Sequence, residues 1–339
     1  MGPLRSILSF IPFFSPYLVL VVTLLGVLQG GLWAFSGFLF VFVFHPILDH
    51  FGGQASDSGV YPGSSFTHGF ASALLWLYLP AQTLVLAMAL NQVGSGGMPF
   101  ENLGFWASAL SVGTLSGGMG ITIAHELIHR RRRWERGIGI LLLFQVNYTH
   151  FRVEHVLGHH RWVGTPRDPA TAREGESLFR FLPRTLLGSL KSAFHLDRKF
   201  VVKALVLQLA LSLAVAFLAG PAALLFHLIQ SAVAILMLET VNYIEHYGLS
   251  RKELRPGVYE AVTEVHSWNS LHRFTNWFLF NLGMHAEHHA HPLVPYQKLS
   301  PIPRPRTLPL GYSALLWAAW IPPVWRRIFV GRLNEGSAN

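Results

Sequence analysis

One segment, residues 103–133, reads LGFWASALSVGTLSGGMGITIAHELIHRRRR and combines three features. Its uncharged apolar part, residues 103–124, is long enough to cross a bilayer as one helix, which takes about 20 residues. The pair His125 and His129 follows at once, and a run of arginines closes the segment. Residues four apart on a helix share one face, so both imidazoles could reach the same metal ion. The segment therefore predicts a membrane span that ends in a metal-binding histidine pair.

The composition is that of a membrane protein. Apolar residues make up 51% of the 339-residue chain and charged residues only 13%, whereas soluble domains carry about 25% charged residues. The formal net charge is +9, yet only Arg5 of the 26 Lys and Arg residues lies before residue 130, and none lies between residues 204 and 250. Such gaps mark the spans of a multi-pass protein rather than a nucleic-acid-binding surface. The absence of cysteine excludes disulfides, iron–sulfur clusters and thiolate-ligated haem within this chain.

These features predict an all-α integral membrane protein, with residues 1–339 as a single membrane-embedded domain. We expect six transmembrane helices and a cytoplasmic-side helical cap that carries the histidine motifs. The expected spans are residues 14–29, 31–48, 68–91, 103–124, 203–219 and 221–241. Residues 138–148 are too short for a span and are expected to form a buried helix or to extend the fourth span. The aromatic tail, residues 312–331, is expected at the membrane interface.

The arginines after His129 indicate the orientation. Six spans place both termini and all histidine motifs on one side of the membrane. Because that side carries Arg130, Arg131, Arg132, Arg133 and most later basic residues, the positive-inside rule makes it cytoplasmic. The N-terminal apolar run lacks a small-residue cleavage site and is expected to be retained.

Three more histidine motifs follow the first: EHVLGHH at residues 154–160, NYIEHYGL at 242–249 and HAEHHAHP at 285–292. Spacings of three and four residues put imidazoles on one helical face, with another at its edge. The nine candidate metal ligands are His125, His129, His155, His159, His160, His246, His285, His288 and His289. Nine imidazoles exceed the needs of one ion and could fill four or five positions on each of two. Imidazole suits iron, copper, zinc and nickel, so the ligand type alone does not select the metal.

The four motifs together resemble those of the integral-membrane alkane 1-monooxygenases, or alkane hydroxylases, of the membrane fatty-acid desaturase and hydroxylase superfamily. The resemblance includes HPILD at residues 45–49 and TPRDP at 165–169, and it covers most of residues 45–300. One departure is MHAE at residues 284–287, where the alkane enzymes are expected to have Arg-His-Ser-Asp; the ligand position is kept but its neighbours change.

The resemblance implies an activity, a cofactor and partners. It implies two iron ions in a non-haem di-iron centre bound by nine histidines, with O2 as co-substrate. The implied reaction hydroxylates an alkyl C–H, at the terminal position, of a medium-chain alkane or similar hydrocarbon. Electrons would come from rubredoxin and an NAD(P)H-dependent rubredoxin reductase. The implied location is the bacterial inner membrane, among membrane lipid, with the active site toward the cytoplasm and no nucleic acid as partner.

Carboxylates and basic residues near the motifs suggest further roles. Glu245, next to His246, is the carboxylate expected to lie near the metal pair or to orient a ligand. Asp168 and Glu126 are expected to accept hydrogen bonds from ligand imidazoles, as carboxylates behind metal-bound histidines commonly do. His150 and His291 are expected to support the ligands. The arginines of residues 130–136, with Arg251, Lys252 and Arg255, could dock an acidic electron donor or could anchor the protein to lipid headgroups.

Other classes of protein share parts of this pattern. HELIH is also the motif of zinc proteases, in which Glu126 would be the general base, but that interpretation leaves seven downstream histidines unused. A haem carrier or ion transporter would be expected to place its histidines along the spans rather than after them. Within the di-iron class, hydroxylation of methyl-substituted aromatics and desaturation of a lipid both stay open.

Overall fold

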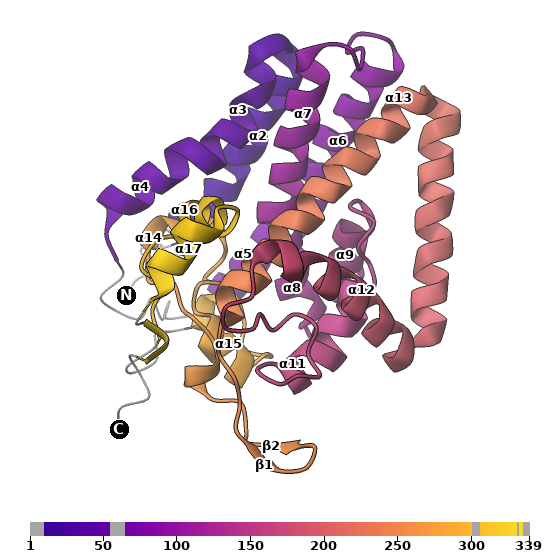
Figure 1. Ribbon diagram of the computed structural model, residues 1–339. Helices are drawn as coiled ribbons and strands as arrows, with labels where there is room; N and C mark the ends of the chain where they lie inside the picture. Colours follow the sequence, from indigo (N-terminus) through magenta and orange to yellow (C-terminus); the bar gives the residue numbers. More distant parts are fainter. Residues whose placement is uncertain (1–9, 55–64, 300–305, 331, 335–339) are drawn as a thin grey trace.

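The computed structural model describes residues 10–54, 65–299, 306–330 and 332–334, and almost all of the regular structure is helical (Figure 1). The fold class is all-α and membrane-type, as predicted. The exception is a short hairpin in which strand β1 (Glu253–Arg255) pairs antiparallel with β2 (Val258–Tyr259).

Five helical segments of the described chain are long and apolar enough to cross a membrane: Ile11–Gln29, Gly31–Gly52, Gly69–Gly94, Leu103–Ile128 and Arg198–His246. Their elements are η1 (Ile11–Phe14), α2 (Ser15–Gln29), η2 (Gly31–Phe35), α3 (Ser36–Leu39), η3 (Phe40–Phe44), α4 (His45–Gly52), α5 (Ser65–Trp76), α6 (Tyr78–Gly94), α7 (Leu103–Leu115), η4 (Ser116–Ile121), α8 (Thr122–Ile128) and α13 (Arg198–His246). The fourth segment runs past the expected end at residue 124, so one continuous helix carries His125 beyond the apolar run.

Helix α13 folds back on itself. Its 49 residues would extend about 74 Å if straight, at 1.5 Å per residue, whereas the hydrocarbon core of a bilayer is about 30 Å thick. Gly220 breaks it with a φ of 85°, a left-handed conformation that favours glycine, and Pro221 begins the second arm. Figure 1 shows the two arms diverging from this break, which lies between the expected spans 203–219 and 221–241.

Small residues let α7 and η4 pack closely against the second arm of α13. A Cβ at Gly113 would lie 2.6 Å from Val233 Cβ, and one at Gly117 would lie 2.8 Å from Ala234 Cα. Either substitution would push the two helices apart. The glycine-rich part of the fourth segment is therefore a helix-packing surface.

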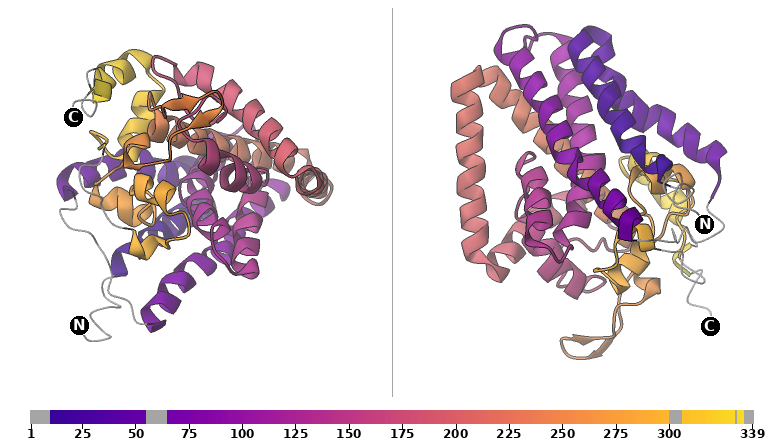
Figure 2. Two further views of the ribbon diagram at one scale, coloured as in Figure 1. Left: turned by 90° about the horizontal axis from the view of Figure 1, so that it is seen from below. Right: turned by 180° about the vertical axis from the view of Figure 1, so that it is seen from behind.

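Shorter elements gather at one end of the bundle, which is the lower end in Figure 1 and in the right view of Figure 2. They are α9 (Arg133–Phe144), α10 (Phe151–Val153), η5 (Glu154–His159), α11 (His160–Trp162), α12 (Leu178–Leu196), η6 (Glu264–His266), α14 (Arg273–Phe278), α15 (His285–Ala290), η7 (Tyr296–Lys298), α16 (Tyr312–Ala319), α17 (Pro322–Phe329) and η8 (Arg332–Asn334). Helix α9 is separate from the fourth apolar segment, because the chain leaves the helix between His129 and Arg132. Residues 138–144 thus form part of a distinct helix rather than an extension of that span.

Helices α16 and α17 pack on the C-terminal end of α13. The ring of Trp325 lies 4.9 Å from that of Tyr243, and both side chains are buried. Tyr312, at the start of α16, is also buried. The tail thus contributes to the protein core, and its location at a membrane interface stays a prediction.

Candidate metal centre

All nine candidate ligands come together in two adjacent groups. The five-histidine group consists of His125, His129, His155, His160 and His288, and the four-histidine group of His159, His246, His285 and His289. Within each group, one ring nitrogen of every member lies within 4.8 Å of the others. Either group could therefore hold one metal ion.

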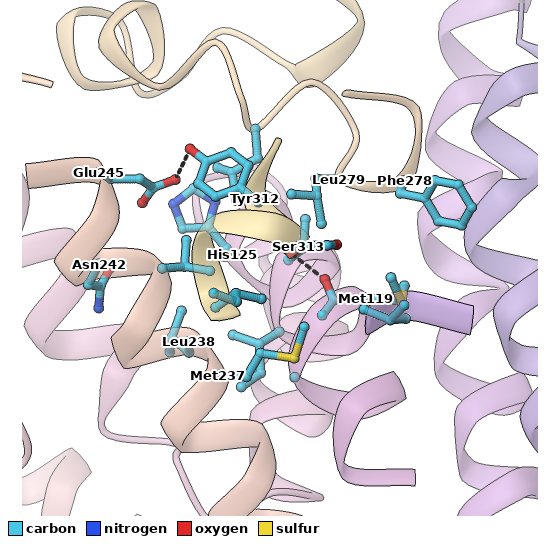
Figure 3. A pocket seen from close by; sticks show the side chains of 18 of the residues that line it. Met119, His125, Met237, Leu238, Asn242, Glu245, Phe278, Leu279, Tyr312 and Ser313 are labelled. Carbon is cyan, nitrogen blue, oxygen red and sulfur yellow. Dashed lines mark hydrogen bonds between the residues drawn. The ribbon is translucent and has the colours of Figure 1, made fainter. Parts of the chain in front are cut away.

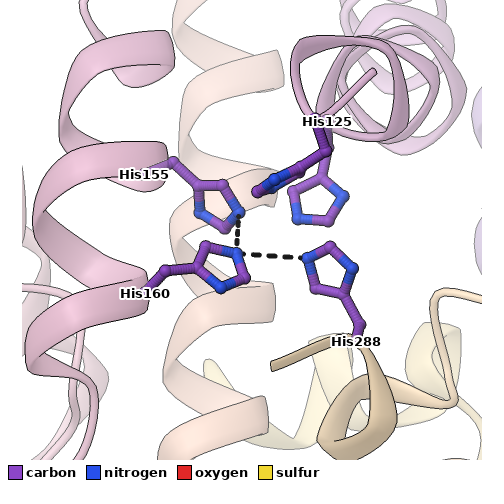
Figure 4. A group of neighbouring side chains, drawn as sticks. His125, His155, His160 and His288 are labelled. Carbon is purple, nitrogen blue, oxygen red and sulfur yellow. Dashed lines mark hydrogen bonds between the residues drawn. The ribbon is translucent and has the colours of Figure 1, made fainter. Parts of the chain in front are cut away.

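The five-histidine group draws on three regions of the chain (Figure 4). His125 lies on α8 and His129 follows it directly, His155 and His160 lie on η5 and α11, and His288 lies on α15. The Nε2 atom of His160 lies 3.0 Å from Nε2 of His155 and 3.2 Å from Nε2 of His288. The imidazoles thus point their Nε2 atoms toward a common centre.

The four-histidine group is arranged in the same way. The Nε2 atom of His285 lies 3.2 Å from Nε2 of His246 and 3.0 Å from Nε2 of His289. His246 ends α13 and His159 ends η5, so the apolar helices and the short elements both contribute to this group.

A π-helix decides how the second motif is divided between the groups. Residues 154–159 form the π-helix η5, in which hydrogen bonds join residues five apart rather than four. His155 and His160, five apart, therefore face the same group, while His159 faces the other. The expected pairing of His155 with His159 on one face is wrong, because it assumed α-helical spacing. On α15 the spacing is α-helical, and His285 and His289 share a group that excludes His288.

Six of the imidazoles outside the membrane-spanning segments are held neutral, because the protein lowers the pKa of each. Burial lowers the pKa of His129 to about 3. Burial and, next, the neighbouring imidazoles also lower the pKa well below its ordinary value in five other members: His155, His160, His285, His288 and His289. Neutral imidazole is the form that binds a metal ion.

Several ring nitrogens in the two groups lack a hydrogen-bond partner and could bind a cation. The Nε2 atoms of His125, His129 and His159 are buried and have no hydrogen-bond partner among the described residues. A buried polar atom without a partner costs about 1–3 kcal/mol, and neutral imidazoles that face one another cannot all donate. A metal ion in each group would bond to these lone pairs at once. The donor set, nine imidazoles in two clusters, fits a two-metal centre of nitrogen-preferring ions such as iron.

Asp168 stands behind the four-histidine group. Its Oδ2 accepts a hydrogen bond of 2.9 Å from Nδ1 of His159 and one of 2.5 Å from the Thr171 hydroxyl, and its Oδ1 accepts from the Ala170 amide at 3.0 Å. Burial alone would raise the pKa of Asp168, but the neighbouring His159 and the hydrogen bonds from His159 and Thr171 outweigh it and lower the pKa. The carboxylate is thus placed to fix the orientation of the His159 ring.

Glu245 lies beside the same group, but on the metal-facing side of a ligand. Its Oε2 lies 3.2 Å from Nε2 of His285, and its Oε1 accepts a hydrogen bond of 2.7 Å from the Tyr312 hydroxyl. Burial, followed by the negative charge of Glu245, raises the pKa of Tyr312 well above its ordinary value, so the tyrosine remains a donor. Tyr312 was not expected at the site, and nothing in the aromatic tail distinguished it in sequence.

Other sequence expectations find different partners. Glu126 forms an ion pair with Arg130, with 2.7 Å between Oε1 and Nη2, and its Oε1 accepts a hydrogen bond of 3.1 Å from the Tyr296 amide. It therefore ties α8 to the region of residue 296 instead of orienting a ligand imidazole. His150 is buried without a hydrogen-bond partner among the described residues, and His291 is exposed. Neither shows the expected support of a ligand.

Glu239 is a buried acid that the sequence reasoning missed. It accepts hydrogen bonds of 2.6 Å from the Tyr148 hydroxyl and 2.7 Å from the Thr185 hydroxyl, and so joins α13 to α12 and to the region before α10. The signal was present, because a lone carboxylate within an apolar span usually has a role there.

A largely apolar pocket reaches both histidine groups (Figure 3). His125 and His155 line it from one group, and His285, with Glu245 beside it, lines it from the other. The space between its side chains is about 720 Å³, including the part open to the outside. Most other lining residues are apolar: Val41, Met119, Ile121, Phe151, Met237, Leu238, Val241, Phe278, Leu279, Leu282 and Leu316.

The hydroxyl groups in this pocket form hydrogen bonds within the protein itself. The Thr122 hydroxyl donates to the Gly118 carbonyl at 2.7 Å, and the Tyr312 hydroxyl donates to Glu245. Ser313 Oγ pairs with Nδ1 of His45 at 2.8 Å. Apart from the histidine groups, Glu245, Asn242 and the Nε2 atom of His45, which has no hydrogen-bond partner among the described residues, the pocket presents mainly carbon to a ligand.

Comparison with known proteins agrees with this arrangement. The fatty acid desaturase family model matches residues 102–313. Alkane 1-monooxygenase 1 of Pseudomonas aeruginosa is 36% identical over 313 residues, which cover 87% of this chain and 82% of the relative. Alkane 1-monooxygenase 2 of Alcanivorax borkumensis is 34% identical over 321 residues, 89% of this chain and 83% of the relative. The xylene/toluene monooxygenase hydroxylase component of Pseudomonas putida is 27% identical over 330 residues, 91% of this chain and 85% of the relative.

Proposed function

Because this chain belongs to the alkane 1-monooxygenase family of membrane monooxygenases, within the fatty acid desaturase superfamily, we propose that it hydroxylates the terminal C–H of a medium-chain alkane. The net reaction consumes one O2, two electrons and two protons for each hydrocarbon, and it yields the alcohol and water. The oxidising equivalents come from O2 and the reducing equivalents from an external donor.

One observation carries the choice of substrate. The pocket touches both histidine groups, and its hydroxyl groups are engaged in hydrogen bonds within the protein. A substrate with a polar headgroup would find few free partners there and would lose its hydration, which costs several kcal/mol for each unpaired polar group. A hydrocarbon gains about 0.8 kcal/mol for each buried CH₂. This favours an alkane over a lipid with a polar headgroup.

The nine histidines are the proposed ligands of two iron ions, five on one and four on the other. When bound, the irons would supply the activation of O2 that C–H hydroxylation requires. The protein's own residues contribute position and dryness: Asp168 orients His159, Tyr312 holds Glu245, and the apolar lining excludes water from the reacting carbon.

The proposed electron donor is rubredoxin, reduced by an NAD(P)H-dependent reductase. Arg131, Arg132 and Arg133 are exposed just after the histidine pair and could attract an acidic protein. Arg251 is less suited to that role than the sequence suggested, because its guanidinium donates to the carbonyls of Glu260 and Arg161. Electrostatic docking predicts that the donor-dependent rate falls as salt is added. A rate insensitive to salt would argue against these arginines as the docking site.

The proposed location is the bacterial inner membrane, with the metal centre toward the cytoplasm. Its support is the exposed arginines at the metal-binding end of an apolar bundle. Protease accessibility of a tag near the histidine groups, in spheroplasts and in inverted vesicles, would test this orientation.

Product analysis tests the proposed activity. Membranes that contain the protein should be given C6 to C16 alkanes, and xylenes separately, together with a reduced rubredoxin system. The expected product is the 1-alkanol of a medium-chain alkane. Similarity to the xylene/toluene hydroxylase component makes hydroxylation of a methyl-substituted aromatic the second candidate, and methylbenzyl alcohol as the main product would favour it. An alkene product would indicate desaturation instead.

Metal analysis of the purified protein tests the centre independently. Two irons per chain are expected, because each histidine group offers one site. A single zinc with no iron would contradict the proposal and would favour the zinc-protease interpretation of the HELIH motif.

A further inference from the structure

A separate, polar pocket lies where the start of α12 meets α17 and the end of α13. Its lining includes Ser177, Arg180, Tyr243, Trp325 and Arg326. The space between its side chains is about 640 Å³, including the part open to the outside. None of the nine candidate metal ligands lines it, so this pocket is distinct from the metal centre.

The pocket has an excess of positive charge. Arg180 and Arg326 line it, both are exposed, and neither guanidinium has a hydrogen bond or ion pair with another described residue. The carboxylate in its lining, Glu176, is already bound, because Arg184 donates from Nε to Oε1 at 2.8 Å and from Nη2 to Oε2 at 2.7 Å. Two guanidinium groups without a partner favour an anionic ligand with several acceptor oxygens, such as a phosphate.

Unpaired N–H groups add to this preference. Helix α12 begins at the pocket, and the Ser177 side chain at its N-cap makes no hydrogen bond to the first turn. The first amides of a helix have no acceptor within it and attract an anion. Trp325 also lines the pocket; it is only 1% exposed, and its Nε1–H has no hydrogen-bond partner among the described residues. Buried N–H groups are nearly always paired, so this one points to an acceptor that a ligand supplies.

The surroundings of the pocket suit a lipid. Phe179, which precedes Arg180, is 54% exposed, and its ring lies 5.7 Å from that of the partly exposed Trp320. Val324, which precedes Trp325, is exposed as well. Tyr243 lies two residues past the expected span 221–241, so the pocket lies at the depth where a span ends and lipid headgroups begin. A soluble anion would gain nothing from these apolar side chains, whereas acyl chains would pack along them.

We propose that this pocket binds the phosphate group of an anionic phospholipid, whose acyl chains lie along Phe179 and Trp320. Arg180 and Arg326 pair with the phosphate, and the Trp325 indole and the start of α12 donate hydrogen bonds to it. The bound lipid joins α12 to α17. The site is independent of the proposed hydroxylation, so it can be tested without an active enzyme.

Removal of both guanidinium groups tests the site. The pocket variant combines Arg180→Gln with Arg326→Gln. The control combines Lys191→Gln with Arg327→Gln, which removes one exposed cation from each of the same two helices but none that lines the pocket. The full-length chain in detergent is titrated with phosphatidylglycerol and, separately, with phosphatidylcholine, and native mass spectrometry counts the lipids bound. The buffer is about 0.15 M ammonium acetate, which screens exposed charges beyond about 8 Å.

The unmodified protein and the control should each hold one phosphatidylglycerol per chain in preference to phosphatidylcholine. The pocket variant should bind phosphatidylglycerol at least about tenfold more weakly, because each basic residue beside an anionic lipid contributes about fivefold. Phosphatidylglycerol should also raise the unfolding temperature of the unmodified protein and the control, but not that of the pocket variant. Equal affinities of the two double variants, or no preference for phosphatidylglycerol, would overturn the proposal.

Inorganic phosphate distinguishes the two sources of the same chemistry. Added to the unmodified protein in place of lipid, it should leave the unfolding temperature unchanged, because it has no acyl chains. Stabilisation by inorganic phosphate equal to that by phosphatidylglycerol would overturn the assignment to a lipid. If the pocket variant unfolds at a lower temperature than the control before any lipid is added, Arg180→Gln and Arg326→Gln are measured singly. Each should then weaken phosphatidylglycerol binding about fivefold, and unchanged binding in both would overturn the site.

Discussion

The five-histidine group and the four-histidine group differ in the residues that support their imidazoles. In the part of the chain that the structure describes, hydrogen bonds within the five-histidine group join imidazoles only, and Phe151 stacks on His155 at 4.7 Å. The four-histidine group has Asp168 behind His159 and the Glu245 carboxylate beside His285. The five-histidine group thus has more imidazoles, whereas the four-histidine group has fewer imidazoles but has carboxylates beside them.

This difference suggests that the two groups respond differently to substitution. A carboxylate behind an imidazole fixes the ring orientation and makes it a stronger ligand. The four-histidine group also lies next to Tyr312 and Glu245 at the pocket wall, where a change in hydrogen bonding could reach the substrate. The four-histidine group should therefore be the more sensitive of the two to single substitutions.

Removal of one ligand from each group should give the largest difference in iron binding between the two groups. His246→Ala leaves three imidazoles in its group, whereas His160→Ala leaves four in the other. We expect His246→Ala to weaken iron binding at its group by more than the about 100-fold that loss of a supporting residue can cost, and activity to be lost. The variant should retain about one iron per chain by elemental analysis.

His160→Ala should keep more of its second iron than His246→Ala does. His150→Ala, which removes a buried histidine outside both groups, is the control and should keep two irons. Equal loss of iron from His160→Ala and His246→Ala would contradict the proposed difference between the groups.

Acidification tests a property that the groups share, the neutrality of their imidazoles. An unfolded histidine protonates near pH 6.5, whereas folded His129 protonates only near pH 3. Between these values the unfolded chain binds more protons, so the metal-free protein must lose stability as the pH falls. The loss should reach about 1.4 kcal/mol per pH unit below 6.5 from His129 alone.

Thermal unfolding of metal-free protein in detergent, between about pH 7 and pH 5, measures this slope. His129→Gln should make it shallower, because glutamine does not titrate. An unfolding temperature that rises on acidification would show that the buried imidazoles are not neutral.

Asp168→Asn should affect one group and spare the other. The substitution removes the negative charge behind His159 while keeping an amide of similar size. Loss of such a supporting carboxylate typically costs about 10–100-fold in metal affinity. Chelator competition should therefore release one iron per chain faster than in the unmodified protein. Glu174→Gln, which removes an exposed acid from the same loop, is the control. Two irons released at equal, unchanged rates would exclude a role for Asp168 in holding His159.

Tyr312→Phe should have the smallest effect. It removes only the hydroxyl that donates to Glu245, a hydrogen bond of 2.7 Å. A hydrogen bond of this kind contributes about 0.5–1.5 kcal/mol, or about 2–10-fold in rate if it matters for the reaction. Both irons should remain. The control is Tyr17→Phe, whose hydroxyl donates to the Leu74 carbonyl away from the centre. Equal activities of the two variants would remove Tyr312 from the site's function.

Local sequence patterns predicted the positions of most of the helices. Uncharged runs of span length, and glycines at 30, 31 and 220 where the backbone has positive φ, placed the helices close to where the structure has them. Ends were less accurate: the fourth apolar segment runs to Ile128, and α12 was not recognised as a distinct helix. An amphipathic helix at the edge of a membrane bundle lacks the length of uncharged sequence that marks a span.

The sequence by itself determined which histidines could serve as ligands, because their spacing is local in three of the motifs and the fourth motif holds a single histidine, His246. It also determined that they follow the apolar runs. Only the tertiary structure decided that they divide five to four, since the π-helix at residues 154–159 turns His159 away from His155. It likewise brought Tyr312 to Glu245 across 67 positions of sequence. Such contacts depend on how whole helices pack against one another, and packing is the sum of many weak, distant contacts that no short motif encodes.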